Sequence, residues 1–366
     1  MIFNKIRNLN YFIIFLLILL SFIGAAGLYS AADGSYQPWA SRHLIRFYFF
    51  LILAILISLI NIKTIYKFSY LFFALTLLLL LSIELFGVLG KGASRWIRIF
   101  GFNLQPSELI KIAIILSLAK FYHDLKFEKV KNILYLIIPF LIIFIPFIFV
   151  VIQPDLGTSL SIVMLGIFIL FSAGVRIWKF ITGFIISILS IPILLNYIQP
   201  YQKNRIISFL NPESDPLGQG YQLIQSKIAL GSGGSYGKGF LQGSQSYLEY
   251  LPEKQTDFIF TLIGEEFGFI GTIFIMLLFL LLISICFYIS IKSYHIFGRL
   301  LALGVASNIF IYVIMNIAMV SGLMPVVGIP LPLISYGGSV MLSIMISIGL
   351  VLNVELNYNK KKLSDA

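Results

Sequence analysis

Three carboxylates stand where a long polar stretch of the chain meets an apolar run. Asp257 comes just before the run, and Glu265 and Glu266 follow about two helical turns later. A carboxylate placed in this way can act as a general base or hold a divalent cation. Asp257 also suits the simpler role of a helix N-cap. Three acidic residues exceed what capping requires, so the junction is a candidate catalytic site.

A second group of charged residues lies in GASRWIRIFGFNLQPSELIK, which begins at Gly92. Arg95 falls in a short connection, and Glu108 and Lys111 open the next apolar run. An ionised group in the membrane costs about 2.5–3.5 kcal/mol, so such residues usually face protein or water. Glu108 and Lys111 could therefore belong to a functional site. A helix-start ion pair at i,i+3 explains Glu108 and Lys111 equally well, and both interpretations remain open.

Further candidate contacts come from three short motifs. QPDLGT places Gln153 and Asp155 between two apolar runs, where Asp155 is most economically an N-cap. Lys238 lies in a glycine-rich turn, 231–239, whose backbone N–H groups could form an anion-binding nest. The turn matches no nucleotide-binding pattern, and a flexible surface loop is the alternative. Ser335 lies in SGLMPVVGIPLPLISYGGS, a proline- and glycine-rich stretch that predicts a broken segment lining a cavity.

The composition around these residues is that of a membrane protein. The chain has 366 residues, of which 59% are hydrophobic and 11% charged, against roughly 25% charged in soluble proteins. One cysteine and three scattered histidines predict neither a disulfide framework nor a soft-metal site. We expect an all-α polytopic membrane protein that forms one domain over 1–366. The expected spans are 11–31, 44–62, 68–89, 107–121, 133–152, 156–173, 177–197, 260–290, 299–320 and 333–354.

The distribution of charge predicts the orientation of these ten spans. Most of the 26 Lys and Arg residues fall on the side of the two termini, which the positive-inside rule makes cytoplasmic. The long loop between the seventh and eighth spans, about 196–257, then lies outside. Lys91, Arg95 and Arg98 run against the rule in a short outer connection. They predict either an anionic ligand outside or arginines that snorkel to the interface. This placement does not suit a nucleic acid partner.

Taken in order and spacing, these motifs resemble the SEDS family of peptidoglycan glycosyltransferases. The resemblance rests on GASRW, QPSELIK, QPDLGT, GYQLIQSKIALGSGGSYGKG, LPEKQTDFIF, GEEFGFIG and PLPLISYGGS, and it covers about 92–353. Short termini and the closing motif are more similar to the elongation branch, typified by RodA, than to the division branch, typified by FtsW. One departure is Gln255, which stands where relatives usually carry histidine. Chemistry at this position therefore cannot depend on an imidazole.

The resemblance implies polymerisation of lipid II, a disaccharide-pentapeptide linked to undecaprenyl pyrophosphate. It places the essential carboxylate at Asp257, as general base or as holder of a divalent cation such as Mg²⁺ or Mn²⁺. Arg95, Glu108, Lys111, Gln153, Asp155, Lys238 and Ser335 are the expected substrate-binding residues. No organic cofactor is expected. The implied partners are a class B penicillin-binding protein, which cross-links the strand, and membrane proteins of the elongation machinery.

Two other functions fit a chain of this kind. A lipid II flippase would expose polar sites alternately to both faces of the membrane, whereas the polar features here gather on one side. A non-catalytic scaffold for cell-wall synthases would not require the clustered carboxylates. The sequence therefore favours an enzyme in the bacterial cytoplasmic membrane, with both termini inside and its site facing the exterior.

Overall fold

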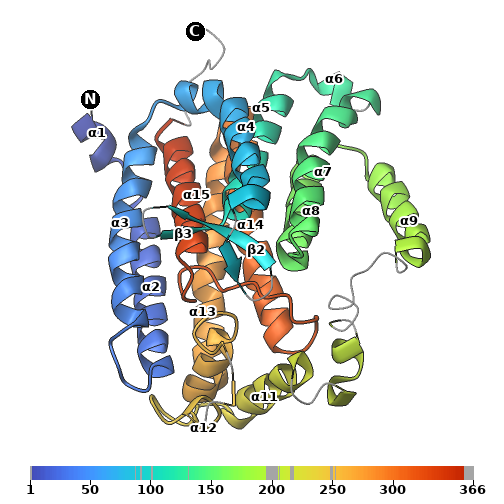
Figure 1. Ribbon diagram of the computed structural model, residues 1–366. Helices are drawn as coiled ribbons and strands as arrows, with labels where there is room; N and C mark the ends of the chain where they lie inside the picture. Colours follow the sequence, from blue (N-terminus) through green and yellow to red (C-terminus); the bar gives the residue numbers. More distant parts are fainter. Residues whose placement is uncertain are drawn as a thin grey trace.

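Long apolar helices make up most of the computed structural model, in which both termini lie at one end (Figure 1). The structure describes residues 2–86, 88–90, 93–99, 102–130, 132–194, 205, 207–214, 218–247, 250–251 and 253–357. The long helices are α2 (Tyr11–Ala31), α3 (Trp39–Leu59), α4 (Ile62–Phe86), α5 (Pro106–Asp124), α7 (Ile137–Ile152), α8 (Leu156–Ser172), α9 (Ile177–Leu194), α13 (Ile259–Lys292), α14 (Ile296–Val320) and α15 (Gly338–Asn357). Each coincides with one of the ten predicted spans, so the predicted fold class is confirmed.

Seven of these helices are long and apolar enough to cross a membrane by length and composition, among the residues that the structure describes. The helices α8 and α9 are apolar but shorter. Helix α5 is long enough but carries Glu108 and Lys111, and most of its side chains are buried. An all-round buried helix can hold polar groups that a lipid-facing helix cannot. The protein is therefore a multi-pass membrane protein with α5 at its centre.

Some helices lie in the interior of the bundle and others at its periphery. Most side chains of α14 and α15 are buried, whereas those of α9 are largely exposed. Figure 1 shows α9 at the edge of the molecule. Because lipid replaces water around a membrane protein, an exposed apolar face such as that of α9 is the expected lipid contact.

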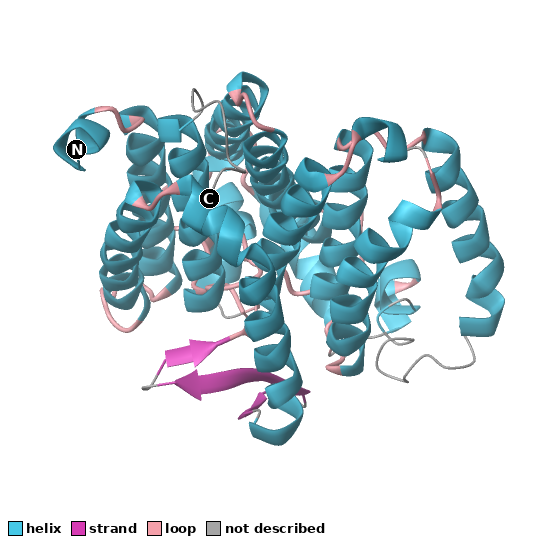
Figure 2. Ribbon diagram, turned by 90° about the horizontal axis from the view of Figure 1, so that it is seen from above, coloured by secondary structure: helices cyan, strands magenta, loops and turns pink. Residues whose placement is uncertain are grey.

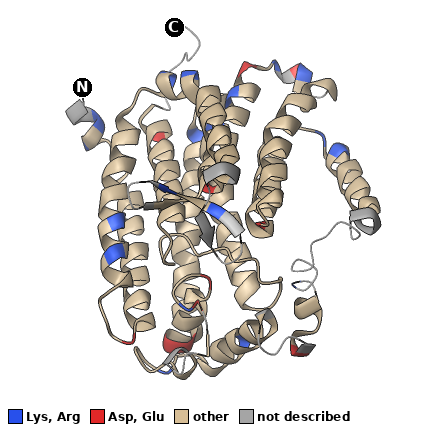
Figure 3. Cartoon of the chain, in the orientation of Figure 1, with Lys and Arg blue, Asp and Glu red and all other residues tan. Residues whose placement is uncertain are grey.

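Short elements lie at the two ends of the bundle. Near the termini are α1 (Ile2–Arg7), α6 (Phe127–Val130) and the 3₁₀ turn η1 (Leu134–Leu136), where Lys and Arg recur (Figure 3). At the opposite end lie α11 (Gln219–Ser232) and α12 (Ser244–Tyr247), and the turn η2 (Pro212–Ser214) also belongs to the long loop. Within the long loop, α11 is the longest helix that the structure describes. The arrangement of termini and long loop on opposite ends also agrees with the predicted even number of spans.

A small antiparallel sheet was not predicted. It consists of β1 (Val88–Gly90), β2 (Ala93–Ile99) and β3 (Phe102–Leu104), in the order β1–β2–β3. Seen from above, the strands lie beside the helices rather than among them (Figure 2). The prediction extended a helix to 89 and treated 90–106 as a loop, which was wrong. The β-branched and aromatic residues Trp96, Ile97 and Ile99 are of the types enriched in strands.

The segment between α14 and α15 has no regular structure. The predicted final span began at 333, but α15 begins at Gly338, because prolines at 325, 330 and 332 interrupt the helix. Gly322 and Gly328 adopt positive φ angles of 77° and 72°. The part from Leu331 to Ser335 is buried. The predicted break between the last two spans is thus confirmed, and its part at 331–335 is enclosed by protein.

Candidate functional site

Asp257 lies just before the start of α13, against the irregular segment 321–337. Its backbone carbonyl accepts a hydrogen bond from Nδ2 of Asn316 at 2.9 Å, and the same amide donates to the carbonyl of Ile329 at 2.7 Å. The N–H of Tyr336 donates to the carbonyl of Gln255 at 2.9 Å. Three hydrogen bonds therefore fix the backbone that carries Asp257 relative to the segment.

The carboxylate of Asp257 faces a residue without a side chain. A Cβ built on Gly328 would lie 3.4 Å from Oδ2 of Asp257. The φ of +72° at Gly328 favours glycine for backbone reasons as well. Asp257 is only partly buried. A partly exposed carboxylate that lies on a fixed backbone, next to a glycine, is a suitable proton acceptor.

The same segment also packs on the start of α8. A Cβ on Gly157 would lie 2.7 Å from the carbonyl oxygen of Val327, so the two backbones are in close contact. Asp155 caps this helix, accepting hydrogen bonds from the N–H and Oγ1 of Thr158 at 3.3 and 2.9 Å. The predicted capping role of Asp155 is confirmed. Residues 327–329 therefore connect the surroundings of Asp155 with those of Asp257.

Asp155 also joins α8 to α5. Its Oδ2 accepts from Nε2 of Gln105, the N-cap residue of α5, at 3.1 Å. The hydroxyl of Ser339 accepts from the N–H of Gln105 at 3.0 Å and donates to the carbonyl of Asn103 at 2.8 Å. The starts of α5, α8 and α15 are consequently held together with β3.

Arg95 extends from β2 to the turn between α7 and α8. Its Nε donates to the carbonyl of Gln153 at 3.2 Å, and its Nη2 donates to the carbonyl of Pro154. The side chain of Gln153 points elsewhere, donating to the carbonyl of Leu80 at 3.1 Å. Arg95 thus fastens the sheet to the α7–α8 turn, next to Asp155.

Glu108 and Lys111 form a charged cluster inside the bundle. Nζ of Lys111 lies 2.8 Å from Oε1 of Glu108, and the two side chains are 1% and 4% exposed respectively. The hydroxyl of Tyr312 bonds both residues, and Oγ of Ser343 donates to Glu108 at 3.3 Å. Lys111 also stands 4.2 Å from the centre of the Tyr312 ring. The predicted i,i+3 pair is confirmed, and Lys111 is enclosed in this conformation.

The glycine-rich turn, predicted as an anion-binding nest or a flexible surface loop, packs against α13. Its N–H groups are not turned toward a ligand, since those of Lys238 and Gly239 donate to the carbonyls of Glu265 and Glu266, each at 3.0 Å. Nζ of Lys238 pairs with Glu265 at 2.7 Å. Two N–H groups of the turn are therefore used in backbone packing against α13 and are not available to an anion.

Ser335 closes a turn. Its Oγ accepts from the N–H of Leu331 at 2.8 Å, and its own N–H donates to the carbonyl of Leu331 at 2.9 Å. The structure thus places the predicted residues in four groups. These are Asp257 with Ser335 and the segment 321–337, Arg95 with Gln153 and Asp155 at the α7–α8 turn, Glu108 with Lys111, and Lys238 with Glu265.

Three residues of the site were missed by the sequence analysis. Tyr312 and Asn316 lie one helical turn apart on α14, and Ser343 lies on α15. A signal was available, because a polar side chain in an apolar span usually serves packing partners or a site. Charged residues at helix starts are the stronger signal in this sequence, and these three residues are neutral and lie within spans.

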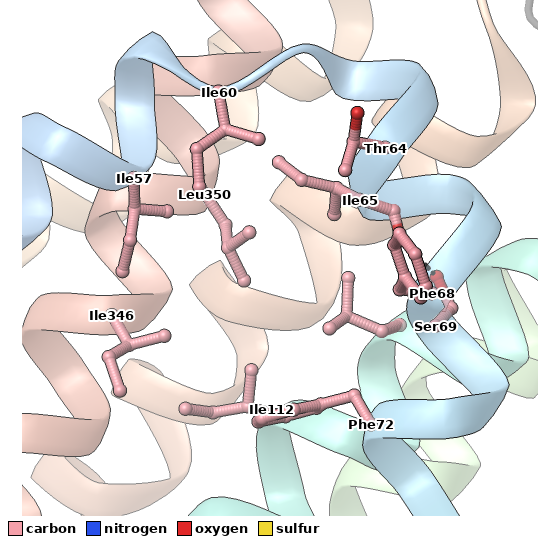
Figure 4. A pocket seen from close by; sticks show the side chains of 11 residues that line it. Ile57, Ile60, Thr64, Ile65, Phe68, Ser69, Phe72, Ile112, Ile346 and Leu350 are labelled. Carbon is pink, nitrogen blue, oxygen red and sulfur yellow. Dashed lines mark hydrogen bonds between the residues drawn. The ribbon is translucent and has the colours of Figure 1, made fainter.

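An apolar cavity lies apart from this polar cluster. It has a volume of about 250 Å³ and lies between α3, α4, α5 and α15 (Figure 4). Its lining includes Ile57, Phe72 and Ile346, and it contains no acidic or basic side chain. Such a cavity suits hydrocarbon, and it offers no group for acid–base chemistry.

The described residues contain no group of three or more His, Cys, Asp and Glu side chains that could hold a metal ion. A cation at Asp257 would therefore have few protein ligands. Mg²⁺ is commonly bound by one or two carboxylates together with substrate phosphates and water. The residues present thus fit a cation that arrives with a diphosphate, and Asp257 would be its protein ligand.

Comparison with known proteins places this geometry in a family. A family model described as "Cell cycle protein", for FtsW, RodA and SpoVE, matches residues 7–360. The peptidoglycan glycosyltransferase MrdB of Escherichia coli (strain K12) is 43% identical over 295 residues, which are 80% of this chain and 78% of the relative. Stage V sporulation protein E of Bacillus subtilis (strain 168) is 42% identical over 294 residues, 77% of this chain and 76% of that one.

Solved structures agree with this relationship. A chain of a peptidoglycan synthase complex that coordinates polymerization and crosslinking is 29% identical, with a TM-score of 0.84 over 97% of this chain and 99% of that chain. The rod shape determining protein RodA of Thermus thermophilus has a TM-score of 0.73 with the same coverage, at 23% identity. The second likeness concerns the fold alone.

Proposed function

The chain belongs to the FtsW, RodA and SpoVE family and is a peptidoglycan glycosyltransferase, and we propose that it polymerises lipid II at Asp257. The observation that carries this proposal is the placement of Asp257. Its carboxylate is partly exposed at a helix start, its backbone is fixed by Asn316, and it faces the bare main chain of Gly328. These are the properties required of a positioned general base.

The proposed reaction joins two lipid-linked sugars. Asp257 accepts the proton of the 4-hydroxyl of the acceptor GlcNAc as that oxygen attacks the anomeric carbon of the donor MurNAc. The bond from this carbon to the diphosphate oxygen breaks, the configuration inverts, and undecaprenyl pyrophosphate leaves with the electron pair. Cationic groups stabilise the leaving diphosphate, and a divalent cation bound with it would add to this stabilisation.

Arg95 and Lys111 are the proposed protein cations for the diphosphate. Arg95 lies in the connection ahead of α5, where β2 meets the α7–α8 turn. Lys111 is enclosed with Glu108 and Tyr312, so its use requires that it exchange Glu108 for the substrate. A flexible four-carbon stem permits such a movement. The charges cost stability inside a membrane, which favours a role for them in turnover.

We also propose how the protein is oriented in the membrane and which proteins are its partners. The end that carries α11 and α12 faces outward, since Lys and Arg are concentrated at the end of the termini. A class B penicillin-binding protein would cross-link the strands, and the structural likeness to a peptidoglycan synthase complex supports a partner of this kind. Assignment to cell elongation rests on the similarity to MrdB and on the resemblance of the closing motif to the elongation branch.

The decisive test of activity uses purified protein, alone and with a class B penicillin-binding protein, incubated with labelled lipid II. Glycan strands and released undecaprenyl pyrophosphate are expected. Vesicles that contain the protein and fluorescent lipid II provide the parallel test of a flippase. Movement of lipid II between leaflets without polymer would overturn the proposal in favour of transport, and neither movement nor polymer would favour a scaffold.

Orientation is tested by labelling with a membrane-impermeant thiol reagent in intact cells. Ser232→Cys, at the exposed end of α11, should react, whereas Lys129→Cys, in α6 at the opposite end, should be protected. Cys286 is buried and does not interfere. Reversed labelling would place the site on the cytoplasmic side and contradict the use of an outer-leaflet substrate.

A further inference from the structure

Helix α13 is interrupted, and the long loop inserts into the interruption. Gly268 has φ and ψ angles of 66° and −162° inside the helix, a conformation essentially restricted to glycine. The next two N–H groups leave the helical pattern. Phe269 donates to the carbonyl of Gly234 at 2.9 Å, and Ile270 donates to the carbonyl of Ser235 at 3.2 Å.

The carbonyls on the other side of the interruption are satisfied by the same loop. In a continuous helix, Glu265 and Glu266 would accept from the residues four positions later. Here they accept from the N–H groups of Lys238 and Gly239, each at 3.0 Å. The contact is close, since a Cβ on Gly237 would lie 2.1 Å from the carbonyl oxygen of Glu266. Both ends of the broken hydrogen-bond ladder therefore depend on one loop.

A buried carboxylate secures this insertion. The side chain of Glu265 is 0% exposed, and its Oε1 accepts from Nζ of Lys238 at 2.7 Å. The same oxygen accepts from Oγ of Ser244 at 3.2 Å and from the N–H of Gln245 at 3.0 Å. The side chain of Lys238 is 28% exposed and supplies the positive charge in this arrangement. Without it, Glu265 would be a buried and uncompensated anion.

The outer half of α13, residues 259–267, connects this cluster to Asp257. Asp257 lies just before the helix at one end, and Glu265 lies about two turns later at the other. Thr261 lies between them, and its Oγ1 is 2.8 Å from Oγ of Ser226 on α11. A short helix that is held at both ends transmits a displacement of one end to the other, because interiors are closely packed.

We propose that Lys238 and Glu265 are positioning residues that hold the outer half of α13 so that Asp257 meets the acceptor hydroxyl. This inference rests on the proposed function and changes one part of it, because Lys238 then acts through Glu265 and not on the diphosphate. Glu265 gathers the loop around the interruption at Gly268, and Lys238 keeps that carboxylate compensated. Neither residue touches substrate.

The two roles of Lys238 make opposite predictions for a paired substitution. If Lys238 binds diphosphate, its removal costs activity whatever stands at 265. If it compensates Glu265, its removal is harmful only while Glu265 is charged. Glutamine at 265 can still accept from Ser244 and Gln245, and it leaves no buried charge when Lys238 is replaced by methionine.

The experiment measures polymerisation by the full-length protein with labelled lipid II for Lys238→Met, Glu265→Gln, the double variant and Lys238→Arg. Lys238→Met should lower kcat by about 10- to 100-fold with KM nearly unchanged, since a displacement of about 1 Å can cost 100-fold. The double variant should match Glu265→Gln within about threefold, and Lys238→Arg should restore most of kcat. Lys126→Met, at an exposed site near the termini, is the matched control.

A double variant at least tenfold worse than Glu265→Gln, or a rise in KM for Lys238→Met, would overturn the proposal in favour of a substrate contact. The comparison of the double variant with Glu265→Gln can still be made if Lys238→Met fails to accumulate. Full activity of Lys238→Met beside an inactive Asp257→Asn would remove the positioning role and leave the proposed function intact. An active Asp257→Asn would instead contradict the proposed function itself.

Discussion

Two carboxylates at helix starts, Glu108 on α5 and Asp257 before α13, have contrasting surroundings. Glu108 is enclosed, and its oxygens accept hydrogen bonds from Lys111, Tyr312 and Ser343. Asp257 is partly exposed, and the surface beside its Oδ2 is the main chain of Gly328. The same type of side chain is thus enclosed in one region and partly exposed in the other.

The difference separates two contributions to one site. A carboxylate that is fully hydrogen-bonded to a lysine and a tyrosine cannot accept a substrate proton without rearrangement. A carboxylate on a fixed backbone with an accessible side chain can do so at once. Because the side chain of Asp257 is partly exposed and its backbone is fixed, we propose Asp257 as the carboxylate that accepts the proton, whereas Lys111 is held by Glu108 in this conformation.

The largest expected effect on stability comes from breaking the enclosed pair. Lys111→Ala leaves Glu108 without its cation in a low-dielectric interior, which should cost about 3–5 kcal/mol of folding free energy. Polymerisation should be lost as well. Thermal unfolding in detergent, followed by fluorescence, measures the first effect, and lipid II turnover measures the second.

Lys111→Ala alone does not separate structure from function, so a paired variant is the control. Glu108→Gln with Lys111→Met removes both charges and largely keeps volume. We expect the unfolding temperature to recover and polymerisation to stay lost. Recovery of both would show that Glu108 and Lys111 only start the helix and that the diphosphate site lies elsewhere.

A smaller effect is expected at Arg95, which lies between the two regions. Its guanidinium donates to the carbonyls of Gln153 and Pro154, and loss of such charge-assisted bonds at a half-buried site should cost about 1–2 kcal/mol. If Arg95 also binds diphosphate, Arg95→Ala should raise KM for lipid II by about tenfold or more. An unchanged KM in a destabilised protein would restrict Arg95 to fastening the sheet.

The smallest effect is expected at the main chain that faces Asp257. Gly328→Ala introduces a Cβ where φ is +72°, at a cost of about 1–2 kcal/mol, and places it 3.4 Å from the carboxylate. Turnover should fall several-fold while membrane insertion is normal. Gly183→Ala on α9, where a Cβ meets nothing within 4 Å, is the matched control and should be fully active. Equal activity of the two variants would mean that the space beside Asp257 is not used.

The ten helices could be predicted because a long apolar run has few alternatives in a membrane. The cap at Asp155, the i,i+3 pair and the end of regular structure after α14 followed from local rules that the residues obey. The sheet at 88–104 was missed because its strands are short and lie in a segment that was interpreted only for charge. Family resemblance, rather than spacing, singled out Asp257.

Contacts between distant parts of the chain could not be predicted. Tyr312 reaches Glu108 across 204 positions, and Asn316 joins Asp257 to Ile329 through backbone carbonyls. The insertion of the glycine-rich turn into α13 depends on where the loop returns in three dimensions, which no local pattern contains. The sequence therefore predicts a substrate contact for Lys238, whereas its side chain contacts Glu265 in the structure.

The most direct test of the account compares substrate binding with turnover in Asp257→Asn. Loss of a general base typically costs about 10²–10⁴-fold in rate, whereas the near-isosteric amide preserves packing beside Gly328. Equilibrium binding of labelled lipid II should therefore stay within about threefold of the native protein, with glycan strands reduced at least 100-fold. Near-normal polymerisation by a well-folded Asp257→Asn protein would contradict the assignment of Asp257 as the catalytic carboxylate.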